Sequence, residues 1–318
     1  MITYKKQTQH VPVLLQAALN ILKPEPGGTY LDATLGGGGH TLAIIKAMLN
    51  QGTIIAIDQD SFALQRSVDL IGKQDFVLTD SDNEIQTFTS SGLKVVLIQG
   101  NFRNLTKYLK RLSVNCCQGI IADLGLSTDQ IMDSQRGFSF LKNSELDMRM
   151  DSSTQVTAKD LLNGLYKKEL VNLFSNLSDI KFANKLAHEI VTTRKQQPLR
   201  TTKQLTAIVQ KIVPYKLRQG AYKNPEAKVF QALRIAVNDE LNALKEFLPQ
   251  AFAALCPEGN LVVISFHSGE DRVVKNYFRD QVNNNKAIFL ANFLKTGQKE
   301  IQENPRSSSA KLRAIGKI

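Results

Sequence analysis

The chain has 318 residues, which is long enough for a large core and, we expect, two domains. No stretch approaches the roughly 20 apolar residues of a membrane span, which excludes that class and predicts a soluble, cytoplasmic protein with no membrane partner. The formal charge of +11 favours a polyanionic partner without identifying it. Cys116, Cys117 and Cys256 show no metal-ligand spacing, so we expect reduced, mostly buried thiols and no metal site.

Four consecutive glycines, Gly36 to Gly39, separate a short apolar run that ends near Asp32 from an amphipathic stretch that begins at His40. This pattern predicts a strand, a turn and a helix. Glycines let backbone N–H groups approach a ligand, and the start of a helix favours an anionic group. A nucleotide-like cofactor is therefore the first inference, and a simple tight turn is the alternative.

A second apolar run, residues 53–57, ends in Asp58, about 20 residues after the glycines, where ribose hydroxyls bind in such folds. NAD(P) proteins use G-x-G-x-x-G, whereas S-adenosylmethionine (SAM) enzymes place an acid a few positions ahead of the glycines, as Asp32 is placed here. SAM is the better fit. We expect Asp32 to receive the cationic amino-acid end of the cofactor and Asp58 to accept from both ribose hydroxyls.

Three further strands are predicted at residues 95–98, at 119–122 before Asp123, and at 260–264. They are short, β-branched and not alternating, as in a parallel sheet that helices cover on both faces. The predicted fold class is therefore α/β, a Rossmann-like sheet. The polar segment 79–92 is expected to be a surface loop or insertion.

Between the fourth and fifth strands the sequence predicts only helices. We expect a cofactor domain formed by residues 1–134 and 226–318, and an inserted helical domain at 135–225. A single long helix over 227–255 is expected to return the chain to the sheet. Tyr215 and Tyr222 are interleaved with many basic residues here, which favours an RNA groove, although the solvated faces of helices explain such lysines equally simply. The basic residues are Lys181, Lys185, Arg194, Lys195, Arg200, Lys203, Lys211, Lys216, Arg218, Lys223 and Lys228.

Ligands in open α/β sheets bind outside the carboxyl ends of the strands. Asp32, Asp58, Asp123 and the turn Ser265-Phe266-His267-Ser268 should therefore face one crevice. Asp123 is the candidate for accepting one N–H of an exocyclic amine that is to be methylated. Its alternative role is structural or cofactor-contacting. Phe102 is expected either to form an apolar wall for the adenine or to pack in the core. Transfer of a methyl group between aligned atoms requires no metal.

The fifth strand is followed by His267, which is a candidate base or a hydrogen-bonded scaffold residue. Ser268 and Asp271 have the spacing of a capping box that would open a helix at residues 271–278. The basic tail, residues 306–317, is expected to be disordered without its partner.

The chain resembles, almost from end to end, the bacterial 16S rRNA cytosine-N4 methyltransferases called RsmH, formerly MraW. The specific part of the resemblance is a set of blocks that occur in the family's order. These are Arg136-Gly137-Phe138-Ser139-Phe140, Leu146-Asp147-Met148-Arg149-Met150-Asp151 and Ile264-Ser265-Phe266-His267-Ser268, with further blocks at 10–15, 32–40, 56–60, 122–127, 230–238 and 303–307.

The resemblance implies SAM-dependent methylation of the N4 amine of one cytosine in the decoding region of 16S rRNA, within the RNA or the small ribosomal subunit. It also implies a helical insert that recognises the RNA, and dimers occur in that family. The positions that would contact the cofactor are Gly38, Gly39, His40, Asp58, Phe102, Asp123 and Gln130.

The chain departs from the family at several places. Thr128 and Asp129 stand where Ser-Pro is usual, which removes a proline from the loop that carries Gln130. Gly269 replaces a larger apolar residue. The remaining alternatives are methylation of an amine in another RNA or in a protein, an NAD(P) oxidoreductase, and a non-catalytic RNA-binding protein.

Overall fold

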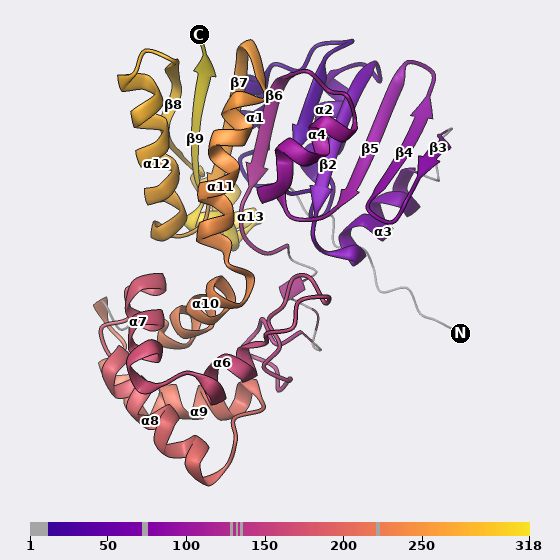
Figure 1. Ribbon diagram of the computed structural model, residues 1–318. Coiled ribbons are helices and arrows are strands. Elements are labelled where there is room, and N and C mark those ends of the chain that lie inside the picture. The colour runs from indigo at the N-terminus through magenta and orange to yellow at the C-terminus, as the bar shows by residue number, and fades with distance from the viewer. Residues whose placement is uncertain (1–11, 72–75, 128–129, 132, 134–135, 221–222) are drawn as a thin grey trace. The chain divides into compact units, whose positions relative to one another are not determined.

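The computed structural model describes residues 12–71, 76–127, 130–131, 133, 136–220 and 223–318. The chain divides into two compact units (Figure 1). The first is formed by Met1–Leu126 and Asn242–Ile318, and the second by Ser127–Leu241. The boundaries expected from the sequence, at 135 and 225, both lie inside the second unit.

The first unit is built on a nine-stranded sheet with the order β3-β4-β5-β2-β1-β6-β7-β9-β8 in the described part of the chain. The strands are β1 (Thr29–Asp32), β2 (Gly52–Asp58), β3 (Val77–Ser81), β4 (Ile85–Ser90), β5 (Leu93–Gln99), β6 (Cys117–Asp123), β7 (Leu255–Ser265), β8 (Ala287–Lys295) and β9 (Lys311–Lys317). Strands β5, β2, β1, β6 and β7 are parallel. Their carboxyl ends therefore lie along one edge of the sheet.

Helices cover both faces of this sheet (Figure 1). On one face α4, α11 and α12 bury Phe247 and Phe278 with Leu31 of β1, and on the other α1, α2 and α3 bury Ile44 with Ile54 of β2. The strands are apolar on both sides for this reason, and the predicted Rossmann-like α/β class is confirmed. The bounds are α1 (Leu15–Leu22), α2 (Gly39–Ala47), α3 (Ser61–Ile71), α4 (Leu105–Arg111), α11 (Glu240–Ala253), α12 (Ser268–Asn283) and α13 (Gln298–Glu303), with short 3₁₀ turns η1 (Phe102–Asn104) and η4 (Pro305–Ser309).

Two segments that were expected to lie outside the sheet belong to it. The expected loop at 79–92 contains β4 and part of β3, which pair antiparallel and extend the sheet beyond β5. The basic tail is not disordered: β9 lies between β7 and β8 and pairs antiparallel with both. The expected loop and the expected disorder of the tail were wrong, because pairing with neighbouring strands can stabilise a strand that contains polar side chains. The alternative of an insertion at 79–92 stays a prediction.

The cysteines also differ from expectation. Cys116 and Cys256 form a disulfide across a sequence separation of 140 residues, so the prediction of three reduced thiols was wrong for these two. Cys116 directly precedes β6 and Cys256 lies at the start of β7, which is the neighbouring strand. Cys117 is free and buried, as expected.

This arrangement predicts the outcome of a thiol titration. Burial raises the pKa of Cys117 to about 12, so the folded protein should react slowly with a thiol reagent at neutral pH. After denaturation without reductant, we expect one reactive thiol per chain, that of Cys117, and all three cysteines only after reduction. Reaction of all three cysteines in the unreduced, denatured protein would contradict the cross-link.

The second unit is helical, as predicted. Its helices bury the expected apolar series, including Leu170, Phe174, Leu186, Ile190 and Leu205. Its elements are α6 (Ala158–Gly164), α7 (Lys167–Ser178), α8 (Ala183–Gln196), α9 (Thr202–Ile212), the 3₁₀ turn η2 (Tyr215–Leu217) and α10 (Pro225–Asn238).

The long helix expected over 227–255 is two helices. Helix α10 ends at Asn238, Asp239 adopts a left-handed conformation with φ 50°, and α11 begins at Glu240. The amide of Asn238 bonds both the Met148 carbonyl and the Met150 N–H, which fixes this end of α10. A helical hydrophobic pattern continues through such a break, so the sequence pattern alone did not reveal it.

No helix in the described residues combines the length and the apolar character that a membrane crossing requires.

Candidate functional site

The glycine turn joins β1 to α2 and has the backbone geometry that requires glycine. Gly36 and Gly38 have φ values of 50° and 76°, and Gly38 is the N-cap of α2. A Cβ at Gly39 would lie 2.2 Å from Cγ of Pro12, whereas a Cβ at Gly37 would meet no atom within 4 Å. The turn therefore packs closely against Pro12 at Gly39 and is open at Gly37. An open stretch of backbone without side chains is what a ligand needs to approach the N–H groups.

Asp32, Asp58 and Asp123 end three adjacent strands of the sheet. The register pairs Asp32 of β1 with Ala56 of β2 and with Ile121 of β6. Asp58 and Asp123 are each two residues beyond those partners, so all three acids lie at the carboxyl edge. The charge of Asp32 acts on the pKa of Asp58, and that of Asp123 acts on the pKa of Asp32. The three acids therefore lie at one edge of the sheet, and the crevice that they were expected to share stays a prediction.

Asp32 is fully buried and its carboxylate is bound by the protein itself. Thr41 Oγ1 donates to Oδ2 at 2.7 Å, and the backbone N–H of Thr34 donates to Oδ1 at 3.1 Å. Burial raises the pKa of Asp32, and the charge of His40 and these hydrogen bonds oppose that rise. Asp32 thus fixes both sides of the glycine turn, since Thr34 precedes the glycines and Thr41 follows them.

Asp58 is partly exposed and holds the same turn from β2. Its Oδ2 accepts the N–H of Gly36 at 2.8 Å, and its Oδ1 accepts the N–H of Asp60 at 2.9 Å. Each carboxylate oxygen has two lone-pair directions, so each retains one for a further donor. Desolvation raises the pKa of Asp58 to about 6, although both backbone hydrogen bonds favour the ionised form.

His40 and Asp123 form a second charged pair at this edge. His40 Nε2 lies 3.5 Å from Asp123 Oδ2, and both side chains are largely shielded from solvent. Burial alone would lower the pKa of His40, but the contact with Asp123, the charge of Asp32 and a backbone hydrogen bond with Val13 raise it. Asp123 Oδ1 is buried and has no hydrogen-bond partner among the described residues.

Phe102 and Gln130 make packing and hydrogen-bond contacts that do not by themselves indicate a role in cofactor binding. Phe102 begins η1, is partly buried against the core, and packs edge-to-face on Phe247 with ring centroids 5.0 Å apart. Gln130 is buried in the second unit, where its Oε1 accepts the N–H of Ser127 at 3.0 Å. Thr128 and Asp129, the departures from the family pattern, lie outside the described residues.

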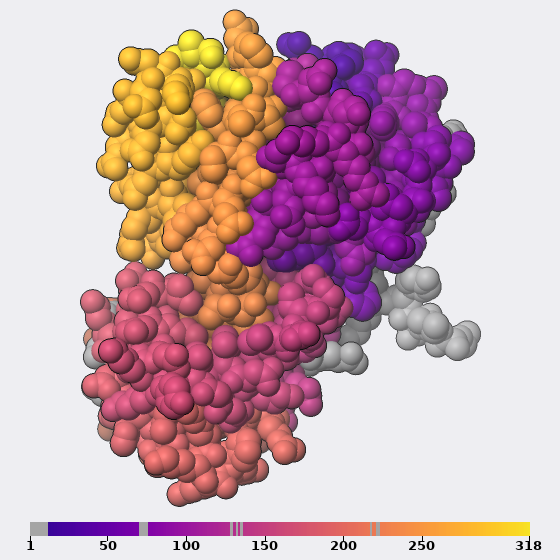
Figure 2. Space-filling view, in the orientation of Figure 1, coloured from indigo at the N-terminus to yellow at the C-terminus, as the bar shows by residue number. Residues whose placement is uncertain are grey.

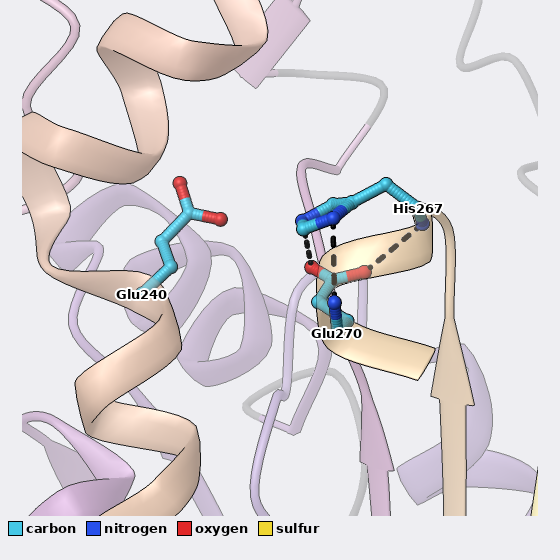
Figure 3. A group of neighbouring side chains, drawn as sticks. All are labelled: Glu240, His267 and Glu270. Carbon is cyan, nitrogen blue, oxygen red and sulfur yellow. Dashed lines mark hydrogen bonds and ion pairs between the residues drawn. The ribbon is translucent and has the colours of Figure 1, made fainter. Parts of the chain in front are cut away.

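His267 is the N-cap of α12, a role that was not expected from the sequence. Its Nδ1 accepts the N–H groups of Gly269 and Glu270 at 3.2 and 3.3 Å, so its proton is on Nε2, 3.1 Å from Glu270 Oε1 (Figure 3). Glu270 Oε2 in turn accepts the N–H groups of Phe266 and His267 at 2.9 and 3.2 Å. The ring is therefore engaged as scaffold.

The capping box expected at Ser268 and Asp271 is consequently wrong by one residue: it is formed by His267 and Glu270. Asp271 instead binds Lys311 and Arg313 of β9, at 3.1 and 2.7 Å. Histidine is not a common N-cap, so the residue types favoured the neighbouring serine. Glu240, also labelled in Figure 3, belongs to the second unit, where Arg234 binds it through hydrogen bonds of 2.7 and 2.8 Å.

Several basic residues of the second unit have structural partners. Arg194 donates to the Leu162 carbonyl at 2.6 Å, and Arg218 donates to the buried Glu226 at 2.6 Å. Tyr215 is 87% exposed, whereas Tyr222 lies outside the described residues. These two arginines therefore have structural roles within the unit. Exposed basic residues of the unit are better candidates for binding a polyanion.

Comparison with known proteins gives the family. The MraW methylase family matches residues 7–318. A ribosomal RNA small subunit methyltransferase H from Heliobacterium modesticaldum is 38% identical, over 97% of this chain and 98% of its own. A protein of the same name from Syntrophotalea carbinolica is also 38% identical, over 98% of each chain. A third, from Mycoplasmopsis pulmonis, is 36% identical over 97% of this chain and 99% of its own. The chain therefore belongs to the MraW methylase family.

Proposed function

We propose that this protein transfers the methyl group of SAM to the N4 amine of one cytosine in the decoding region of 16S rRNA. Membership of a methylase family and relatives named as small-subunit rRNA methyltransferases support the reaction class and the substrate. The single observation that carries the chemistry is the buried Oδ1 of Asp123, an acceptor with no partner among the described residues. Such an atom costs free energy unless a ligand supplies a donor.

The residues at the carboxyl edge fit SAM. The glycine turn offers backbone N–H groups at the start of α2, and Asp58 retains one acceptor direction on each oxygen for the two ribose hydroxyls. Bound SAM would supply a methyl group on its sulfonium sulfur. A suitably aligned nucleophile could bond to that methyl carbon as the C–S bond breaks and S-adenosylhomocysteine leaves, without a metal. Gly38, Gly39, Phe102 and Gln130 are proposed cofactor contacts on the strength of the family motif.

Asp32 is proposed to act through the turn. Both of its oxygens are bound to Thr34 or Thr41 and the side chain is fully buried, so its contribution to cofactor binding is to hold the glycines in place. It also contributes negative charge at the edge where the cationic cofactor would bind. This replaces the direct contact with the amino-acid end that the sequence suggested.

Asp123 is the proposed acceptor for the target amine. The lone pair of the cytosine N4 amine is delocalised into the ring. A carboxylate that accepts a hydrogen bond from one N–H group of this amine makes the lone pair more available for attack on the methyl carbon. We assign this role to Oδ1, because it is buried without a partner among the described residues and Oδ2 lies 3.5 Å from His40 Nε2. His40 is proposed as a positioning residue, whose cationic form orients Asp123.

The pH dependence of SAM binding tests the ribose role of Asp58. A carboxylate must be ionised to accept from two hydroxyls, and the pKa of Asp58 is raised to about 6. Binding should therefore be strongest above pH 6 and weaken by up to about tenfold for each unit below it, because a proton must be displaced. Calorimetry between pH 5 and 8 measures this. Asp58→Asn should remove the dependence, and the same pH profile in both proteins would contradict the assignment.

The substrate is tested in cells. Mass mapping of 16S rRNA from cells with and without this protein should show loss of one methyl group from a cytosine N4. An unchanged methylation pattern would overturn the assigned substrate, and methylation of another RNA or a protein would then be the alternative. Calorimetry with SAM and with NADH separates the remaining class, because an oxidoreductase would bind NADH and not SAM.

The second unit is proposed to contact the RNA. Its exposed Tyr215 and its exposed basic residues, such as Lys203 and Lys216, suit base stacking and phosphate contacts. Extruding a base from its surroundings costs a few kcal/mol, which such contacts would offset. The proposed place of action is the cytoplasm, where small ribosomal subunits are found, and a homodimer is an expectation from the family alone.

A further inference from the structure

The outer strand of the first unit carries an exposed aromatic ring surrounded by cations. Strand β8 ends the sheet, and Phe293 on it is 42% exposed. Lys295 Nζ, Lys311 Nζ and Arg313 Cζ lie 5.3, 5.8 and 5.4 Å from the centroid of its ring. Figure 2 shows this part of the chain, in amber, at the surface of the first unit. The proposed reaction assigns no role to this group.

The charges in this group are only partly compensated. Asp271 binds both Lys311 and Arg313, and Arg313 is 7% exposed, so these two are largely structural. Lys295 is exposed and forms no ion pair with a carboxylate in the described part of the chain. Three cations and one carboxylate leave an excess of positive charge around an exposed ring. A phosphate would compensate that charge, and the ring offers a face for a base.

The register of the sheet places this group on the edge that carries the proposed active site. Asp123 pairs with Ile264, Ile264 with Leu312, and Leu312 with Leu294. Leu294 is therefore in one row with Asp123, three strand spacings or roughly 15 Å away. Phe293 and Lys295 are its two neighbours in β8. If the target cytosine of an RNA strand lies at Asp123, the nucleotides next to it in that strand can reach Phe293 and Lys295.

We propose that Phe293 and Lys295 bind a nucleotide of the RNA substrate near the methylated cytosine, with the base on the Phe293 ring and a phosphate at Lys295. This rests on the proposed function, and it adds an RNA contact on the sheet unit to the one expected of the helical unit. Stacking on an aromatic ring is tolerant of sequence, so the contact contributes affinity and positioning rather than base identity. RNA is favoured over a protein partner here because a polyanion matches the uncompensated charge.

The chain contains no tryptophan, which makes a direct test available. Phe293→Trp would carry the only indole of the protein, and its fluorescence should be quenched when unmethylated small subunits or their protein-free RNA are added. Phe289→Trp is the matched control, because Phe289 lies on the same strand and is 39% exposed. Equal quenching at both positions, or none at 293, would overturn the proposal.

Affinity and salt dependence provide the second measurement. Phe293→Leu should weaken binding of the RNA about tenfold, and Lys295→Gln should reduce the slope of log K against log salt by about 0.7. Phe289→Leu and Lys286→Gln, at the other end of the strand, should leave both unchanged. SAM affinity should be the same in all four variants.

The outcomes separate this inference from the proposed function. If the unmodified protein methylates small-subunit RNA but Phe293→Leu and Lys295→Gln bind it as their controls do, only the inference falls. If the unmodified protein neither binds nor methylates that RNA, the result contradicts both the proposed function and this inference. A change in oligomeric state of Phe293→Leu, with unchanged RNA affinity, would assign the surface to a second copy of the chain and overturn the RNA contact.

Discussion

Replacing Asp123 with asparagine is expected to lower kcat by about 100-fold or more, with the fold intact. The proposed role requires an acceptor of full negative charge at Oδ1, the buried oxygen that has no partner among the described residues. An asparagine of the same shape offers at most a neutral carbonyl there. The backbone N–H of Asp123, which donates to Thr34 Oγ1 at 2.6 Å, is unaffected by the change.

The measurement is single-turnover methyl transfer at saturating SAM and saturating RNA, which separates chemistry from binding. SAM affinity is the control, and it should change far less than kcat. His40→Gln should reduce the rate less than Asp123→Asn, because His40 acts through Asp123. An unaltered rate for Asp123→Asn under these conditions would remove the acid from the reaction.

Asp58→Ala is expected to weaken SAM binding by about 100-fold or more. Two hydrogen bonds from ribose hydroxyls to a charged carboxylate are each worth roughly 1.5 kcal/mol or more, and both are lost. The Gly36 N–H loses its partner as well, which loosens the turn that faces the cofactor. Because the loss occurs on binding, kcat at saturating SAM should fall much less than affinity.

Asp69→Ala is the matched control for this experiment. Asp69 is exposed on α3, and its side chain accepts a hydrogen bond from Gln65 at 3.1 Å in the described part of the chain. Its removal changes the net charge equally and leaves the glycine turn intact. Calorimetric titration of both variants with SAM measures the difference. Equal affinities in Asp58→Ala and Asp69→Ala would refute the ribose role of Asp58.

Features of the sequence that act locally predicted where the strands that carry the candidate site end. The glycine run, the acids Asp32, Asp58 and Asp123, and the apolar runs before them are each contained within about ten residues, and strand ends of a parallel sheet meet by topology. The class of fold and the edge that carries the site could therefore be inferred before any coordinates. The internal contacts of Asp32 could not, because Thr34 and Thr41 are brought to it by the turn itself.

Features set by distant partners were missed. Strand β9 is stabilised by β7 and β8 on either side, and neither pairing is encoded in the basic sequence of the tail. Cys116 and Cys256 are neighbours only because β6 and β7 are neighbours. The break at Asp239 and the His267 cap depend on single backbone conformations that residue type does not specify.

The disulfide has a consequence for proteolysis. The whole second unit, Ser127–Leu241, lies between Cys116 and Cys256 in the chain, so the cross-link closes a covalent ring around it. A protease that nicks this unit once would yield two fragments that migrate as one species until reductant is added. Strands β6 and β7 would thereby stay tethered to each other even in a protein whose polypeptide has been cut between them.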